Sequence, residues 1–482
     1  MKTHALIVAV VAFASRLFAL DGQIQIHDPS TIVRCDGRFY TYGTGGSCLV
    51  SDNGWTWTRG VSPPRRGMAP DVIHVGDRYL LYVARNVGAQ PRADINLIWS
   101  KSLNTNSLDY KWEEGGVVAS SDGVEDCNAI DPGLLLDPND GKLWMVYGSY
   151  FGFIRLVELD PKTGGRINPN DTPLNLAVNC EAPILIYHDG WYYLLATHGS
   201  CCRGAESGYN IRMGRSKKVT GPYLDHTGLD MIRGGGTLFA GSTSRHIGPG
   251  HFGLLDLGDG VQKFSCHYEA DLDRGGASVL EIRPLLWRDG WPVAGENLRD
   301  GTYQIESVRT GTVLELGVQG VPVGGARPRR GGPPDAGIFG GTGRGPIPPQ
   351  KVIDVSTNWP AGNVDVRLAN YLDQAQQKWT ITAVTNAGGY PGSPYFKITV
   401  ADTDRTLAAS DDAELVTLQQ FTGGPEQLWR IDQLADGTWR IMPKSHPQAR
   451  EPFALSAVGA SFATLSKFDP AGDRHRWLIN TP

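Results

Sequence analysis

Three acidic residues stand next to or near proline at well-separated points of the chain. Asp28 and Asp131 each precede a proline directly, and Glu181 lies two residues before one. Hydrolysis of a glycosidic bond needs a protonated carboxyl that protonates the leaving oxygen and an ionised one that activates water or attacks the sugar. A third acid nearby can hold the donor protonated, because like charges resist joint ionisation. If the fold brings these three acids together, they predict a glycoside hydrolase, with the longer Glu181 as the proton donor.

Asp-Pro is also a common turn, so each acid alone is weak evidence, and the pattern around the acids matters more. A unit recurs five times before residue 295: a polar residue beside Pro or Gly, a short apolar strand, a Gly/Asp turn, and a strand rich in aromatic residues. Repeats of this length are typical of propellers and other repeat architectures. The units begin at 27–30, 69–71, 130–132, 181–183 and 249–251, and their turns are 36–37, 76–77, 140–141, 189–190 and 259–260.

The repeat predicts an all-β chain that begins with a five-bladed β-propeller at residues 21–297. Asp-Gly between apolar runs is a hairpin signal, and the spacing leaves room for two further strands in each unit. Four-stranded units arranged around an axis make a propeller, whose inner strands line the centre. The five polar residues at the unit starts should then meet at one end of the axis. A five-unit sandwich or solenoid with surface acids is the alternative, but solvated acids would not need such regular placement.

A second repeat occupies residues 298–482 and predicts a β-trefoil. Each of its three copies opens with a short strand and closes on tryptophan, at Gln377-Lys378-Trp379, Gln427-Leu428-Trp429 and His475-Arg476-Trp477. Residues 321–349 are rich in Gly, Pro and Arg, and we expect them to form a surface loop without fixed structure.

The N-terminal residues predict a secreted protein, and the net charge argues mildly against a polyanionic partner without identifying a substrate. Residues 1–20 contain Lys2 and then an apolar run, which indicates a signal peptide, and no later stretch is apolar for long enough to cross a bilayer. A net charge of −5 gives no indication of nucleic-acid binding. We therefore expect no nucleic acid, no membrane association and a monomer.

The chain has seven cysteines, all in its first 270 residues. An odd number leaves at least one thiol unpaired within the chain, and no Cys/His spacing suggests zinc. Cys35 and Cys48 flank a predicted hairpin and could form a disulfide across it. Burial as small apolar side chains is the alternative for most of the seven.

Residues 23 to about 293 resemble glycoside hydrolase family 43, most of all its arabinan-degrading branch. The resemblance implies inversion of configuration, with Asp28 as general base, Asp131 as pKa modulator and orienting residue, and Glu181 as general acid. It rests on ordered motifs: His27-Asp28-Pro29-Ser30, Ala69-Pro70-Asp71-Val72, Asn128-Ala129-Ile130-Asp131-Pro132, the run 143–152, Glu181-Ala182-Pro183, Cys201-Cys202-Arg203-Gly204, Gly234-Gly235-Gly236-Thr237, Gly248-Pro249-Gly250-His251 and His267-Tyr268.

The resemblance also implies a metal and a sugar subsite. His251 matches a histidine that helps to hold a hydrated ion, often Ca²⁺, although a buried, hydrogen-bonded histidine is the alternative. A neutral imidazole is a poor ligand for this hard cation, so waters would supply most of its ligands. Asn128 and Ser149 match positions that line the sugar being cleaved, and His27 neighbours the base. No organic cofactor is implied.

Two departures from the arabinanase pattern leave the cleavage mode open. Met68 stands where tryptophan usually precedes Ala-Pro-Asp, and the segment 84–88 lacks the aromatic residue expected there as a wall for the sugar. We predict an endo-1,5-α-L-arabinanase-like enzyme of plant-polysaccharide breakdown. An exo-acting α-L-arabinofuranosidase or a β-xylosidase is the first alternative. A catalytically silent carbohydrate-binding protein is the second, although such a protein would be expected to have lost one of the three acids.

The C-terminal repeat resembles the ricin-B-type trefoils, in which the closing tryptophan is structural. Sugar sites in these trefoils usually need an acid in an apolar strand. Asp354 or Glu315 could serve in the first repeat, whereas the matching strands of the other two contain none. We expect at most one carbohydrate site there, and a purely structural role is the alternative.

Overall fold

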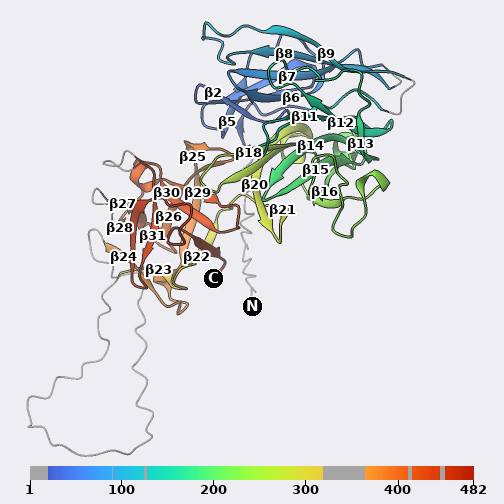
Figure 1. Ribbon diagram of the computed structural model, residues 1–482. Coiled ribbons are helices and arrows are strands. Elements are labelled where there is room, and N and C mark those ends of the chain that lie inside the picture. Colours follow the sequence, from blue (N-terminus) through green and yellow to red (C-terminus); the bar gives the residue numbers. More distant parts are fainter. Residues whose placement is uncertain (1–19, 89–90, 124–126, 318–363, 411–414, 446–450) are drawn as a thin grey trace, which may run out of the picture. The chain divides into compact units, whose positions relative to one another are not determined.

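The computed structural model describes residues 20–88, 91–123, 127–317, 364–410, 415–445 and 451–482 (Figure 1). The predicted signal peptide, apart from Leu20, and the insertion at 321–349 lie outside the described residues. The chain forms two compact units. One comprises the residues up to Arg299 with Ala383–Tyr395 and Arg430–Trp439, and the other comprises the remainder from Asp300 on. None of the described helices has the length and apolar character that a membrane span requires.

The first unit is built from five antiparallel sheets in chain order, which confirms the predicted five-bladed propeller. Each blade runs from its inner strand outward. The blades are β2 (Val33–Cys35), β3 (Arg38–Gly43), β4 (Ser47–Ser51) and β5 (Thr56–Arg59), with β1 (Asp21–Gly22) parallel to β5; β6 (Met68–Val75), β7 (Arg78–Arg85), β8 (Arg92–Ser100) and β9 (Glu113–Asp122); β10 (Gly133–Leu136), β11 (Leu143–Tyr147), β12 (Phe153–Leu159) and β13 (Leu174–Val178); β14 (Glu181–His188), β15 (Trp191–His198), β16 (Asn210–Ser216) and β17 (Thr237–Ala240); and β18 (His246–Asp256), β19 (Gln262–Asp271), β20 (Ala277–Arg288) and β21 (Trp291–Ala294). Short 3-10 turns are η1 (Thr44–Gly46), η2 (Gly204–Glu206), η3 (Met231–Arg233) and η4 (Leu272–Arg274).

The predicted Asp-Gly turns join the first two strands of their blades. In the fourth blade, Asp189 and Gly190 have φ values of 46° and 78°, so both central residues of the hairpin are left-handed. Two-residue hairpins of this kind match the twist of the strands, and Asp and Gly tolerate the positive φ that they require. The turns at 36–37 and 259–260 have the same conformation.

Every blade carries a left-handed, non-glycine residue within its inner strand or in the segment just before it. These residues are Asp28, Ala69, Asp131, Ala182 and His251, with φ between 41° and 53°. In three blades the strand pairing shifts at this point, as in a β-bulge. Such backbone is uncommon outside glycine and gathers at functional sites, where the surrounding structure holds it. The fivefold recurrence aims the side chains at 28, 131 and 251 from equivalent positions.

The ring is held by packing between blades and by the start of the chain. Tyr82 and Leu97 of the second blade share an apolar cluster with Met145 and Val157 of the third. The first blade is tied to the fifth because Leu280 on β20 donates to the carbonyl of Ile24 at 2.9 Å. Together, these contacts between neighbouring blades hold the inner strands around a common axis.

The expected disulfide between Cys35 and Cys48 does not form, and that expectation was wrong. Cys35 lies on β2 and Cys48 on β4, with β3 between them, and both thiols are free and buried. Strands two places apart are about 9.5 Å apart, whereas a disulfide needs Cα atoms within about 7 Å. The hairpin instead joins β2 to β3. Cys201 and Cys202 form a disulfide between neighbouring residues in the loop that follows β15.

The second repeat folds as the predicted trefoil, in which each closing tryptophan plays the same structural role. The indole nitrogens of Trp379, Trp429 and Trp477 donate to the carbonyls of Leu314, Leu407 and Leu455 at 2.9 to 3.1 Å. The strands from residue 300 on are β22 (Gly301–Ser307), β23 (Val313–Leu316), β24 (Val364–Ala369), β25 (Trp379–Tyr390), β26 (Ser393–Val400), β27 (Thr406–Ala409), β28 (Leu415–Leu418), β29 (Trp429–Gln433), β30 (Trp439–Pro443), β31 (Phe453–Val458), β32 (Phe462–Lys467) and β33 (Trp477–Asn480), with 3-10 turns η5 (Ala375–Gln377) and η6 (Pro425–Gln427).

Of the two acids suggested for a trefoil sugar site, Glu315 is occupied by its neighbours. Its carboxylate accepts hydrogen bonds from Arg367 at 2.7 and 3.0 Å and from the Gln377 side chain at 2.8 Å. Three of its roughly four acceptor positions are therefore already used within the protein. Asp354 lies outside the described residues.

Candidate active site

The five unit starts meet at the propeller axis, as the repeat predicted. A cavity of about 20 Å³ is lined by residues from the inner-strand segments of all five blades, including Pro29, Asp71, Asp131, Pro183 and His251. The charges of Asp28 and Glu181 both raise the pKa of Asp131, so the three predicted acids lie within electrostatic reach of one another.

Asp28 is a buried carboxylate surrounded by imidazoles. One of its oxygens accepts a hydrogen bond from the Thr44 hydroxyl at 2.5 Å and lies 2.9 Å from Nδ1 of His27, and the other lies 3.2 Å from Nδ1 of His251. Burial alone would raise the pKa of Asp28, but His251, His27 and His267 outweigh burial and hold it well below its usual range. Asp28 is therefore ionised throughout the neutral range.

His27 bridges two carboxylates. Its Nδ1 faces Asp28, and its Nε2 lies 3.0 Å from Glu269 on β19. Burial lowers the pKa of His27, but the hydrogen bonds to the two acids outweigh it and raise this pKa to about 10. The pKa of Glu269 falls to about 2, since its bonds to His267 and His27 overcome burial. The charged imidazolium of His27 thus fixes the orientation of the Asp28 carboxylate.

Glu181 has the opposite electrostatic environment. Burial is the main cause that raises its pKa, with the charges of Asp28 and Glu269 adding to it, and the pKa reaches about 7. A hydrogen bond donated by the Tyr209 hydroxyl acts against this rise. One carboxyl that is ionised and another that keeps its proton up to about neutral pH therefore face the same axis, which is the division that glycoside hydrolysis needs.

Asp131 positions the Glu181 segment through the backbone. Its carboxyl accepts a hydrogen bond from the amide of Ala182 at 3.0 Å. Burial, followed by the charge of Glu181, raises the pKa of Asp131 well above its usual value. Because Ala182 follows Glu181 directly, this bond fixes the backbone from which the Glu181 side chain extends.

Asp71, the acid of the second unit, has a different environment. It accepts hydrogen bonds from the amides of Thr31 at 2.8 Å and Leu134 at 2.9 Å, which belong to the first and third blades. Burial raises its pKa to about 6. Asp71 thus joins three neighbouring blades, and both of its oxygens are already engaged.

The predicted sugar-contacting residues are found together but deep in the protein. The Asn128 amide donates to the Ser149 hydroxyl at 3.4 Å, and both side chains are almost fully buried. The Asn128 carbonyl oxygen has no hydrogen-bond partner among the described residues. The Ser149 hydroxyl, in contrast, accepts the hydrogen bond from the Asn128 amide.

His251 has the features of a neutral ligand. Burial lowers the pKa of His251 to about 4, so its ring is uncharged at neutral pH. Within the described part of the chain, neither ring nitrogen makes a hydrogen bond of good geometry, although Nδ1 lies 3.2 Å from Asp28. An orphaned imidazole nitrogen fits a metal ligand. One nitrogen does not complete a Ca²⁺ shell of six to eight oxygens, so the residues fit a largely hydrated ion.

Sequence reasoning missed three members of the site: Glu269, Tyr209 and Thr44. Glu269 follows the motif His267-Tyr268, and alternation along β19 places 267 and 269 on one face, so this residue could have been found. Tyr209 lies at the end of a long loop before β16, and Thr44 belongs to a 3-10 turn. No repeat signal marks either position.

A buried ionised aspartate and a proton-bearing glutamate at the axis of a five-bladed propeller define a two-carboxyl glycoside hydrolase. The sequence agrees with this class. Residues 41–292 match the glycosyl hydrolases family 43, and the chain belongs to that family. Residues 375–451, which include the closing Trp379 and Trp429, match the ricin-type β-trefoil lectin domain-like family.

Three similar proteins each match between 55% and 62% of this chain and most of their own length. The extracellular exo-α-(1→5)-L-arabinofuranosidase of Cellvibrio japonicus is 33% identical over 62% of this chain and 94% of its own length. The extracellular endo-α-(1→5)-L-arabinanase 1 of Bacillus subtilis is 32% identical over 55% of this chain and 87% of its own length. The solved α-L-arabinanase of Cellvibrio cellulosa in complex with arabinohexaose has a TM-score of 0.53 and 29% identity, and the match covers 56% of this chain and 96% of that one.

Proposed function

We propose that this protein is an arabinan endo-1,5-α-L-arabinanase that inverts the configuration at the cleaved carbon. The contrast between Asp28 and Glu181 carries the proposal, because in mildly acidic solution Asp28 is ionised while Glu181 still keeps its proton. The similarity to an arabinanase and an arabinofuranosidase supports the choice of sugar.

In the proposed mechanism, each side chain has one task. Asp28 removes a proton from the attacking water, and Glu181 gives its proton to the leaving oxygen. Asp131 holds the backbone at Ala182, and the charged His27 keeps Asp28 in position. Asn128, whose buried carbonyl oxygen has no partner among the described residues, and Ser149, which accepts a hydrogen bond from the Asn128 amide, are the proposed sugar-contacting pair.

An exo-acting α-L-arabinofuranosidase is the second candidate, and the position of Met68 favours it. Met68 begins β6 with 41% of its surface exposed, where an aromatic residue would form a flat wall for a sugar ring. Weaker stacking would reduce the hold on a long chain in the substrate groove. A β-xylosidase would use the same carboxyls on a different pentose.

The cleavage products distinguish these candidates. On debranched linear arabinan, an endo-acting enzyme should release a ladder of arabino-oligosaccharides early in the reaction, as measured by anion-exchange chromatography. Arabinose as the sole early product would replace the endo assignment with the exo one. Release of xylose from xylobiose, together with inactivity on arabinan, would overturn both.

The pH profile should report the raised pKa of Glu181. Activity requires Asp28 ionised and Glu181 protonated, so kcat/KM should stay level in mildly acidic solution and fall as the pH rises through about 7. Tyr209→Phe removes a donor that lowers the pKa of Glu181, so the alkaline limb should move to higher pH. The control is Tyr395→Phe, a partly exposed tyrosine of β26. An unchanged limb in Tyr209→Phe would contradict the assignment of this limb to Glu181.

We also propose a hydrated Ca²⁺ ion bound at Nε2 of His251. Such an ion would supply a positive charge beside the axis and further stabilise ionised carboxylates. Treatment with EDTA should therefore lower the melting temperature and the activity, and added Ca²⁺ should restore both. His251→Ala should make the protein insensitive to EDTA. Full activity and an unchanged melting temperature after exhaustive chelation would contradict a bound ion.

Secretion, a monomeric state and carbohydrate binding by the trefoil complete the proposal. The similar enzymes of Cellvibrio japonicus and Bacillus subtilis are named extracellular, which supports secretion. Fractionation of the producing cells, light scattering and binding of the whole protein to insoluble arabinan test the three points. Activity retained inside the cells would contradict secretion, a particle larger than one chain would contradict the monomer, and no binding to insoluble arabinan would contradict a carbohydrate site in the trefoil.

A further inference from the structure

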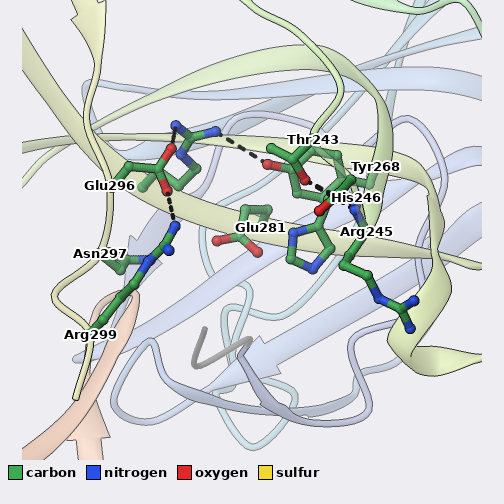
Figure 2. A pocket seen from close by; sticks show the side chains of 10 residues that line it. Thr243, Arg245, His246, Tyr268, Glu281, Glu296, Asn297 and Arg299 are labelled. Atoms are coloured by element: carbon green, nitrogen blue, oxygen red, sulfur yellow. Dashed lines mark hydrogen bonds and ion pairs between the residues drawn. The ribbon is translucent and has the colours of Figure 1, made fainter. Parts of the chain in front are cut away.

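A closed-in cavity lies in the fifth blade, lined by residues other than the carboxyls assigned to catalysis. Its volume is about 150 Å³, and it is bounded by the start of β18, by β19 and β20, and by the segment that follows β21 (Figure 2). A cavity of about this volume in another protein admits one benzene ring. The space therefore suits a single small ring and excludes an oligosaccharide.

The cavity contains a buried carboxyl that nothing in the described part of the chain satisfies. Glu281 on β20 is 8% exposed, and none of the described residues makes a hydrogen bond or ion pair with its oxygens. In Figure 2 its carboxyl lies between Glu296 on one side and His246 on the other, with no dashed line to either. An unpartnered polar group of this kind is destabilising unless a ligand or water supplies the missing bond.

Glu281 keeps its proton at neutral pH. Burial is the main cause that raises its pKa to about 8, and the nearby Arg283 does not offset it. A neutral carboxyl is both a hydrogen-bond donor and an acceptor, as a sugar hydroxyl is. It offers no charge to a cationic ligand.

The arginines around the cavity are already paired with acids. Arg283 donates to Glu296 at 2.5 Å, and Arg299 lies 3.8 Å from the other oxygen of Glu296. Arg245 donates to Asp273 at 2.5 and 2.8 Å. Because each guanidinium has a carboxylate partner, an anion would find little uncompensated positive charge. The remaining wall includes the Tyr268 ring stacked on His246 at 4.8 Å, which provides a flat surface.

We propose that this cavity is a second, non-catalytic site that binds one neutral sugar ring of pentose size, with its hydroxyls bonded to Glu281. The proton-bearing carboxyl, the paired arginines and the flat His246–Tyr268 wall match a polyhydroxylated ring with no charge. The choice of L-arabinose as the ring rests on the proposed function, whereas the class of ligand does not. The site would hold a single released sugar while the catalytic axis remains open.

Calorimetric titration of the whole protein with L-arabinose and with D-xylose tests this site. Glu281→Met removes both hydrogen-bonding oxygens at similar volume and should weaken pentose binding by about tenfold or more. Glu281→Gln keeps a donor and an acceptor and should stay within about threefold of the native protein. Glu158→Met, which removes a surface acid paired with Lys142, is the matched control and should bind as the native protein does. Hydrolysis of an aryl arabinofuranoside should be unchanged in all three.

A soaked crystal of the native protein gives a second readout that requires no variant to fold. Density for one ring beside Glu281 is the expected result. Water alone in the cavity, equal pentose affinity in Glu281→Met and the native protein, or binding of phosphate or acetate in place of the pentoses would overturn the proposal. Binding is measured without hydrolysis, so an enzyme inactive on arabinan that still binds a pentose here would contradict the proposed function and leave this site standing.

Discussion

Glu181→Ala should reduce hydrolysis of arabinan by about a thousandfold while sparing a substrate whose leaving group needs no proton. The sugar oxygen that leaves from arabinan is a poor leaving group, and Glu181 carries its proton because burial raises the pKa of that carboxyl. A 2,4-dinitrophenyl arabinofuranoside loses a stable anion without help. The loss on that substrate should therefore be about tenfold or less. Initial rates on the two substrates measure the difference.

A matched control separates this effect from general damage. Glu158 on β12 is a surface glutamate that pairs with Lys142 at 3.2 Å, and Glu158→Ala should leave both rates unchanged. Equal loss on both substrates in Glu181→Ala, with the fold intact by circular dichroism, would reject Glu181 as the proton donor.

Asp28→Asn should have the second large effect, and that effect should not depend on the leaving group. The amide has the same shape and can still contact Thr44, but it cannot accept a proton from water. Both substrates should lose about a thousandfold to ten-thousandfold in kcat. The acid limb of the native profile should lie at very low pH, because His251 and the other imidazoles hold the pKa of Asp28 down.

The pattern across the two variants is more informative than either loss alone. An acid and a base on opposite sides of one sugar predict a leaving-group-dependent loss at Glu181 and a uniform loss at Asp28. Substantial activity on arabinan in Asp28→Asn would show that another group activates the water. Glu269 would then be the nearest candidate, since it shares His27 with Asp28.

The repeat in the sequence was sufficient to predict the five blades and the meeting of their first residues. Turn chemistry explains this success, because Asp-Gly pairs such as Asp189-Gly190 adopt the left-handed hairpin that the pattern requires. The trefoil followed from Trp379, Trp429 and Trp477, whose indoles make equivalent bonds. In both parts, a local signal repeated at a fixed interval determined the fold.

Contacts between distant segments could not be predicted in this way. Asp71 resembled the catalytic acids by its place in the repeat, yet its oxygens bond to amides of two other blades. Tyr209 reaches Glu181 from a loop whose path no periodicity fixes. The Cys35–Cys48 disulfide failed as a prediction because strand order, and not separation along the chain, sets the distance between thiols. The raised pKa values of Glu181 and Asp131 depend mainly on burial, and burial cannot be read directly from the sequence.

The configuration of the first product tests the central claim most directly. If a water molecule lies between Asp28 and the sugar while Glu181 protonates the other side, an α-L-arabinofuranoside must first yield the β-anomer. Proton NMR of the native enzyme, recorded before mutarotation, should show the β-anomeric signal rising first. An α-anomeric signal rising first would mean that a carboxylate attacks the sugar itself, and the assignment of Asp28 as a base acting on water would be contradicted.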